Sequence, residues 1–245
     1  MKIRQNPSPN FDERRANADI QLVVIHYTGT KALEDVLHQL CDDKADARVS
    51  AHYLIDEEGN IYQLVPEEKR AWHAGISYWH GETDINSISI GIELLNDGQK
   101  AFSDKQLASL ALLCQDIRGR YKIPAQNVIG HSDIAPDRKQ DPGPLFPWRK
   151  MSKIDIGIWP KPSLIDHFNA AAVAKNDKKL KNLFKKAGYE TNKTSLPQLT
   201  AAFQSRFAPD EFGRNPDKPS AAMVARLRAY ARQQKKQNRK YRKNR

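Results

Sequence analysis

The 245-residue chain lacks the features of a disulfide-framework or membrane-spanning protein. Its two cysteines, Cys41 and Cys114, show no CxxC spacing, so we predict free, buried thiols, with one long-range disulfide as the alternative. No apolar run approaches the roughly 18 residues that a transmembrane helix requires. Residues 1–15 also lack the apolar segment of a signal peptide. We therefore expect a cytoplasmic protein, or a periplasmic or cell-envelope protein if a leader is missing or export is non-classical.

Acidic residues are absent from the end of the chain. Ten Lys and Arg lie between Arg226 and Arg245 with no Asp or Glu among them, and they account for nearly all of the formal net charge of +11. Excess positive charge can indicate nucleic-acid binding. A terminal run of like charge, however, is usually a solvated helix end or a disordered arm. We therefore expect no specific nucleic-acid partner, and keep a basic nucleic-acid-associated protein as a rival interpretation.

Strand and helix patterns alternate along the first two thirds of the chain. β-branched runs and a turn at 57–60 indicate strands, whereas apolar residues at helical spacing indicate helices. The predicted strands are 22–28, 50–56, 61–65 and 87–95, and the predicted helices are 32–42 and 103–121. The second helix opens on a capping-box sequence, Ser103 to Gln106. These elements predict an α/β (α+β) fold with a mixed central β-sheet flanked by helices.

The composition changes at Pro160-Lys161-Pro162, which has the character of a linker. Beyond it β-branched residues are scarce, and three apolar stripes at helical spacing predict a small three-helix bundle. We therefore predict a first domain at 1–159, a helical domain at 160–231 and a basic tail at 232–245.

Residues 130–144 form a candidate metal-binding loop. His131 follows a short apolar run and Asp141 precedes Pro142, and imidazole nitrogen and carboxylate oxygen are both zinc ligands. His26, at the end of a predicted buried strand, is the best third donor. A lone histidine is more often a core or loop residue, so the prediction depends on the three residues together. Three protein ligands leave one position open, as in a catalytic zinc site, and we predict one Zn²⁺ per chain.

Five short motifs occur in a fixed order, at 24–28, 50–55, 71–75, 89–94 and 130–144. This order resembles that of the zinc N-acetylmuramoyl-L-alanine amidases, in the AmpD/AmiD branch of the amidase-2 family, which shares its fold with T7 lysozyme and the peptidoglycan-recognition proteins. The resemblance spans roughly residues 19–159. More weakly, the C-terminal helices resemble the peptidoglycan-binding-like bundle of AmiD proteins.

The resemblance implies hydrolysis of the amide between the lactyl group of N-acetylmuramic acid and L-alanine, in peptidoglycan or muropeptides, during cell-wall turnover or recycling. It implies that Glu93 moves protons, with partial burial raising its pKa, and that Lys139 stabilises the oxyanion. The alternatives are a Glu93 on the solvent face of an edge strand and an ordinary surface Lys139. A non-catalytic peptidoglycan-recognition module is the alternative function.

Residues 71–77 lack a clean period and combine an aromatic, an imidazole and a glycine, which predicts a loop. We expect Trp72, His73 and Ala74 to line the substrate groove, with Trp72 as a core residue as the alternative. The resemblance treats His52 as part of the cleft wall or core rather than a fourth ligand. The helical domain is expected to position the enzyme, so a chain ending near Pro160 should still cleave soluble muropeptides.

Overall fold

The computed structural model describes the backbone of residues 1–243 and the side chains of residues 1–235. The chain forms two compact units, which we call the first and the second unit. The first unit consists of Met1–Ser77, Asp84–His131 and Asp141–Ile158, and the second of Tyr78–Thr83, Ser132–Gln140 and Trp159–Arg245. The second unit thus takes two short segments from the earlier part of the chain. The predicted domain division at 159/160 stays a prediction.

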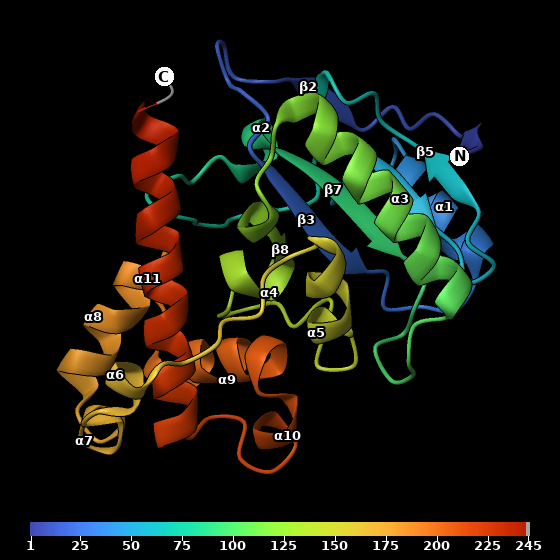
Figure 1. Cartoon of the computed structure of the whole chain (residues 1–245). Coiled ribbons are helices and arrows are strands. Elements are labelled where there is room, and N and C mark those ends of the chain that lie inside the picture. The colour runs from blue at the N-terminus through green and yellow to red at the C-terminus, as the bar shows by residue number, and fades with distance from the viewer. Residues whose placement is uncertain (244–245) are drawn as a thin grey trace. The chain divides into compact units, whose positions relative to one another are not determined.

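The first unit is built on a six-stranded mixed sheet with the order β1-β5-β4-β7-β3-β8 (Figure 1). Its strands are β1 (Ile3–Gln5), β3 (Leu22–Tyr27), β4 (Tyr53–Ile55), β5 (Ile61–Gln63), β7 (Ser89–Leu94) and β8 (Val128–Gly130). Strand β3 pairs in parallel with β7 and β8, and β4 pairs antiparallel with β5. The mixed sheet, the buried central strand and the hairpin are therefore confirmed. Two further strands, β2 (Phe11–Glu13) and β6 (Lys69–Ala71), form a separate antiparallel pair.

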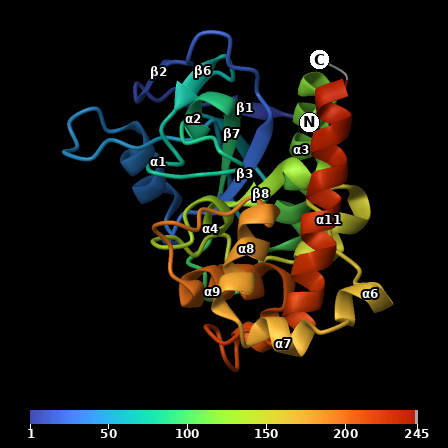
Figure 2. The ribbon, with the colours of Figure 1, turned by 90° about the vertical axis from the view of Figure 1, so that its left-hand side faces the viewer.

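Two helices cover opposite faces of this sheet, as Figure 2 shows. Helix α1 (Leu33–Cys41) packs Val36 and Leu40 on a cluster that includes Leu54. Helix α3 (Asp104–Tyr121) buries the predicted stripe of Leu107, Leu110, Leu113, Cys114 and Ile117. Shorter elements are α2 (Ile85–Ile88), η1 (Ala125–Asn127), α5 (Trp148–Met151) and η2 (Ser152–Ile154), with α4 (His131–Ile134) at the boundary between the units. Both predicted helices are confirmed.

The predicted capping box at the start of α3 is only half formed. The Ser103 hydroxyl accepts a hydrogen bond from the Gln106 backbone N–H at 3.0 Å. The buried Gln106 side chain instead donates to the backbone carbonyls of Ile55 and Leu95, at 2.9 and 3.2 Å. Since unpaired buried carbonyls are costly, Gln106 serves the sheet rather than the helix end.

The second unit is helical. It contains α6 (Leu164–His167), α7 (Ala170–Ala174), α8 (Asp177–Ala187), α9 (Leu196–Phe207), α10 (Pro209–Phe212) and α11 (Ala221–Lys243). The three predicted stripes lie on α8, α9 and α11, and the short helices α6, α7 and α10 were not expected. The predicted basic tail at 232–245 begins inside α11, while residues 244–245 lie outside the described residues. Among the described residues no helix is both long and apolar enough to cross a membrane.

Both cysteines are free, as predicted, although only Cys114 is fully buried and Cys41 is partly exposed. Burial raises the pKa of the Cys114 thiol to about 12. This thiol is therefore protonated at neutral pH and acts as a small apolar core residue.

A buried carboxylate ties three segments of the first unit together. Glu67 accepts hydrogen bonds from the hydroxyls of Tyr53 and Tyr121, each at 2.8 Å, and from both terminal nitrogens of Arg120. Burial alone would raise the pKa of Glu67, but the hydrogen bonds from Arg120 and the two tyrosines lower it. The group therefore stabilises the fold above the unfolded-state pKa of about 4.3, and this contribution is lost as the pH falls through the lower folded-state pKa.

We predict that Glu67→Gln lowers the free energy of unfolding at pH 7 by about 1–3 kcal/mol, because it removes a buried charged acceptor. The difference from the unchanged protein should shrink below about pH 4, as the carboxylate protonates. Denaturant titrations at pH 7 and pH 3 measure both effects. Glu58→Gln is the control, since Glu58 pairs with Lys105 while both side chains are exposed, and its effect should stay below about 0.5 kcal/mol. An equal effect of the two substitutions would contradict the prediction.

Candidate metal centre

Three adjacent parallel strands bring the predicted site residues to one edge of the sheet. The carboxyl ends of parallel strands meet at the same edge, where open α/β sheets bind their ligands. His26 lies directly opposite Glu93 in the pairing of β3 with β7, and Ile25 lies opposite Gly130 of β8. His131 follows Gly130 at once, so both histidines and Glu93 reach this edge.

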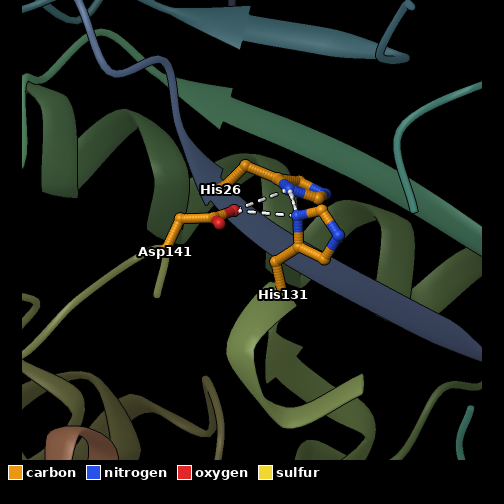
Figure 3. A group of neighbouring side chains, drawn as sticks. All are labelled: His26, His131 and Asp141. Carbon is orange, nitrogen blue, oxygen red and sulfur yellow. Dashed lines mark hydrogen bonds and ion pairs between the residues drawn. The ribbon is translucent and has the colours of Figure 1, made fainter. Parts of the chain in front are cut away.

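Three donor atoms converge there, as Figure 3 shows for His26, His131 and Asp141. The Nδ1 atoms of the two histidines lie 3.0 Å apart, and the Asp141 Oδ2 lies 2.9 Å from His26 Nδ1 and 3.0 Å from His131 Nδ1. All three residues are buried, with 1%, 2% and 6% of their surface exposed. The structure therefore brings together the three residues predicted as metal ligands.

The partner of the second nitrogen of His131 determines which nitrogen can bind a metal. His131 Nε2 lies 3.1 Å from the backbone carbonyl oxygen of Ala74, which can only accept a hydrogen bond. The proton must therefore sit on Nε2, and Nδ1 keeps its lone pair. Ala74 is in turn held by its N–H, which donates to Asn86 Oδ1 at 2.8 Å. The Ala74 carbonyl thus orients the ring of His131, a proposed ligand. The predicted contact of Ala74 with substrate stays a prediction.

A longer chain of hydrogen bonds fixes the tautomer of His26. The Ser89 hydroxyl donates to the Ile85 carbonyl at 2.6 Å, so its oxygen accepts from His73 Nε2 at 3.0 Å. His73 Nδ1 then accepts from His26 Nε2, also at 3.0 Å, which leaves the lone pair of His26 on Nδ1. Burial, followed by the neighbouring imidazoles of His26 and His52, lowers the pKa of His73 well below its usual value, so the ring is neutral. Ser89 was not among the residues predicted for the site, and a polar residue that opens an apolar strand was its only signal in the sequence.

This donor set fits zinc. Zinc takes imidazole nitrogen and carboxylate oxygen at about 2.0–2.2 Å, and tetrahedral donors at such distances lie about 3.3 Å apart, close to the separations found here. Metal-binding histidines also donate their other ring N–H to a fixed acceptor, as both histidines do. Asp141 supplies the carboxylate oxygen of the donor set, and its Oδ2 lies within 3.0 Å of both Nδ1 atoms.

Glu93 lies beside the donor atoms without being one of the three. Its Oε1 is 4.0 Å from His26 Nδ1, and 15% of its side chain is exposed. Glu93 is therefore partly buried beside the three donor atoms. Its role as proton carrier stays a prediction.

His52 is fully buried behind the site. The Gly91 backbone N–H donates to His52 Nδ1 at 3.0 Å, and His52 Nε2 lies 3.1 Å from the Lys69 carbonyl. Burial, together with the nearby Arg14, lowers the pKa of His52 to about 3. Both ring nitrogens therefore form hydrogen bonds with the backbone inside the core, and a contact of His52 with substrate stays a prediction.

Trp72 and Lys139 are the remaining predicted site residues. Trp72 is partly exposed, and its ring lies 5.2 Å from the guanidinium carbon of Arg48. Lys139 is exposed and belongs to the second unit, where it lines a cavity of about 270 Å³. Their predicted contacts with substrate and oxyanion stay predictions.

A glycine makes room for the ring of His73. A Cβ atom on Gly91 would lie 2.4 Å from His73 Cγ, well inside van der Waals contact, whereas a Cβ on Gly119 in α3 would meet nothing within 4 Å. We predict that Gly91→Ala lowers the free energy of unfolding by about 1–3 kcal/mol through overpacking. Gly119→Ala, the control, should raise it by up to about 1 kcal/mol, because alanine favours the helix. Thermal unfolding of the two variants tests this, and an unchanged Gly91→Ala protein would contradict it.

Comparisons with known proteins identify relatives of this chain. Residues 16–144 match the family described as Amidase_2, N-acetylmuramoyl-L-alanine amidase. The chain is 36% identical to the N-acetylmuramoyl-L-alanine amidase AmiD of Escherichia coli over 231 residues, covering 85% of this chain and 82% of that protein. It is 40% identical to the 1,6-anhydro-N-acetylmuramyl-L-alanine amidase AmpD of Escherichia coli over 164 residues, covering 60% of this chain and 88% of that protein.

A solved structure extends the similarity to most of the chain. The complex of E. coli AmiD with anhydro-N-acetylmuramic acid-L-Ala-D-γ-Glu-L-Lys superimposes with a TM-score of 0.76 at 35% identity, covering 90% of this chain and 93% of that one. The family match includes His26, Glu93 and His131, and it extends through Asp141. With the mixed sheet and the two-histidine, one-aspartate centre, these matches show that the chain belongs to the amidase-2 family of N-acetylmuramoyl-L-alanine amidases.

Proposed function

We propose that this amidase uses one zinc ion, held by His26, His131 and Asp141, to hydrolyse the amide between the lactyl group of N-acetylmuramic acid and L-alanine in muropeptides. The observation that carries the proposal is the convergence of three oriented donor atoms beside Glu93. The substrate class is supported by the AmiD complex, which contains an anhydromuramyl peptide, and by the name of AmpD.

Each residue has a separate part in the proposed reaction. A zinc ion held by His26, His131 and Asp141 would act as a Lewis acid, which lowers the pKa of water and polarises a carbonyl. Glu93 accepts a proton as the water oxygen bonds to the lactyl carbonyl carbon, and it returns the proton to the alanine nitrogen as the C–N bond breaks. Lys139 stabilises the negative charge that develops on the carbonyl oxygen. The products are a muramyl carboxylate and a peptide with a free amino terminus.

The metal shell is tested by Asp141→Ala, which removes one of three ligands. We expect the unchanged protein to hold about one zinc per chain, to lose muropeptide hydrolysis on chelation and to recover it with added Zn²⁺. Asp141→Ala should lower the zinc content, measured by elemental analysis after dialysis. Full hydrolysis by a metal-free preparation would refute the proposed zinc chemistry.

A separate experiment distinguishes a role of Glu93 in metal binding from a role in proton transfer. Glu93→Gln keeps the shape of the side chain but cannot accept a proton, so kcat should fall by about 10²–10⁴-fold while zinc content stays near normal. Lys139→Ala, the companion variant, should also keep its zinc. Zinc loss in Glu93→Gln would place Glu93 among the ligands instead.

A further inference from the structure

The segment that joins two of the proposed ligands belongs to the second unit. The chain leaves the first unit after His131 and returns at Asp141, and Ser132–Gln140 between them lies with Trp159–Arg245. Contacts between this segment, which we call the metal loop, and the C-terminal helices are therefore contacts within one compact unit. Because the metal loop is covalently joined to His131 and Asp141, these contacts restrict where the two proposed ligands can lie.

A buried ion pair joins the metal loop to α9. Asp133 and Arg206 have 0% and 2% of their surface exposed. The Asp133 Oδ2 accepts a hydrogen bond from Arg206 Nη1, and its Oδ1 accepts one from the Tyr189 hydroxyl at 2.7 Å. Both carboxylate oxygens are thus held by side chains that lie beyond residue 159 in the sequence.

Arg206 and Tyr189 are themselves fixed by aromatic packing. The guanidinium carbon of Arg206 lies 4.7 Å from the ring centroid of Phe207 and 5.9 Å from that of Tyr230. The Tyr189 ring packs edge-on against Phe184, with centroids 5.5 Å apart. Removing either partner of a buried ion pair leaves a desolvated charge, so the arrangement strongly opposes movement of Asp133.

A second contact holds the far part of the metal loop. Gln198 Nε2, at the start of α9, donates to the Asp137 carbonyl at 3.1 Å. Lys139 remains exposed on the wall of the cavity of about 270 Å³, which α9 residues such as Ala201 and Ser205 also line. Helix α9 therefore anchors the loop backbone while it leaves the Lys139 side chain accessible.

We propose that Arg206 and Tyr189 are positioning residues for the metal centre, in that they hold Asp133 and so fix the loop between His131 and Asp141. The inference rests on the proposed function, since it concerns the affinity of that zinc site. It gives the C-terminal helices a part in metal binding in addition to any contact with the cell wall.

The test compares two tyrosines of one aromatic cluster in the full-length chain. Tyr189→Phe removes only the hydroxyl that binds Asp133, whereas Tyr230→Phe removes a hydroxyl from the cluster and keeps the ring beside Arg206. We expect Tyr189→Phe to weaken zinc binding about fivefold, as the loss of one hydrogen bond would, and Tyr230→Phe to leave it unchanged. Arg206→Gln should weaken it about 10–100-fold, the usual effect of losing a supporting group. Competition with a chromogenic chelator measures the zinc Kd.

A second readout does not depend on metal. Amide hydrogen exchange at 132–140 should speed up in Tyr189→Phe and not in Tyr230→Phe, with or without zinc. Equal zinc affinity in all variants, or equal weakening by both tyrosine substitutions, would overturn the inference. If the unchanged protein binds no zinc, the proposed function fails; the anchoring of the loop is then judged by exchange, and unchanged exchange in Tyr189→Phe refutes it.

Discussion

The parallel pairing of β3 with β7 and β8 is the constraint on which the site depends. Side chains alternate between the two faces of a sheet, so a slip of one residue would send His26 to the wrong face. The observed register sets His26 opposite Glu93 and delivers His131 from the neighbouring strand. The strands are buried on both faces by apolar side chains, and this packing holds the register.

The polar atoms around the three proposed ligands are held by hydrogen bonds within the protein. The Nε2–H of His131 donates to the Ala74 carbonyl, which can only accept. The Nε2–H of His26 donates to His73 Nδ1, which is left as an acceptor because His73 Nε2–H donates to the Ser89 hydroxyl. The inward nitrogens therefore present lone pairs without rotation or proton exchange. Donors oriented in this way would hold the proposed zinc ion with little reorganisation of their side chains.

The sequence allowed much of this to be predicted, because its signals are local. Short stretches of sequence are enough to find the strand ends that carry His26 and His131. They are also enough to find an aspartate ahead of a proline and apolar stripes at helical spacing. The support of the site could not be found in this way. Asp133 and Arg206 are 73 residues apart, and neither residue belongs to a periodic pattern that points to the other. Gln106 shows the same limit: its sequence position predicts a cap, whereas three-dimensional packing directs its side chain to the sheet.

The chain returns to the first unit at Asp141, long before the residues that hold the metal loop are synthesised. A ribosome makes the chain from its amino terminus, so His26, His131 and Asp141 all exist before Arg206 has been added. Until then the Asp133 carboxylate lacks its buried partner, while the metal loop keeps backbone hydrogen bonds such as those from the Lys139 N–H to the Ala135 carbonyl and from the Tyr78 N–H to the Ile134 carbonyl. If the proposed anchoring holds, the support of the metal loop is completed only after Arg206 has been added. A chain ending near Pro160 would contain all three proposed ligands and lack the two side chains that hold Asp133. The expectation that such a chain cleaves soluble muropeptides stays a prediction.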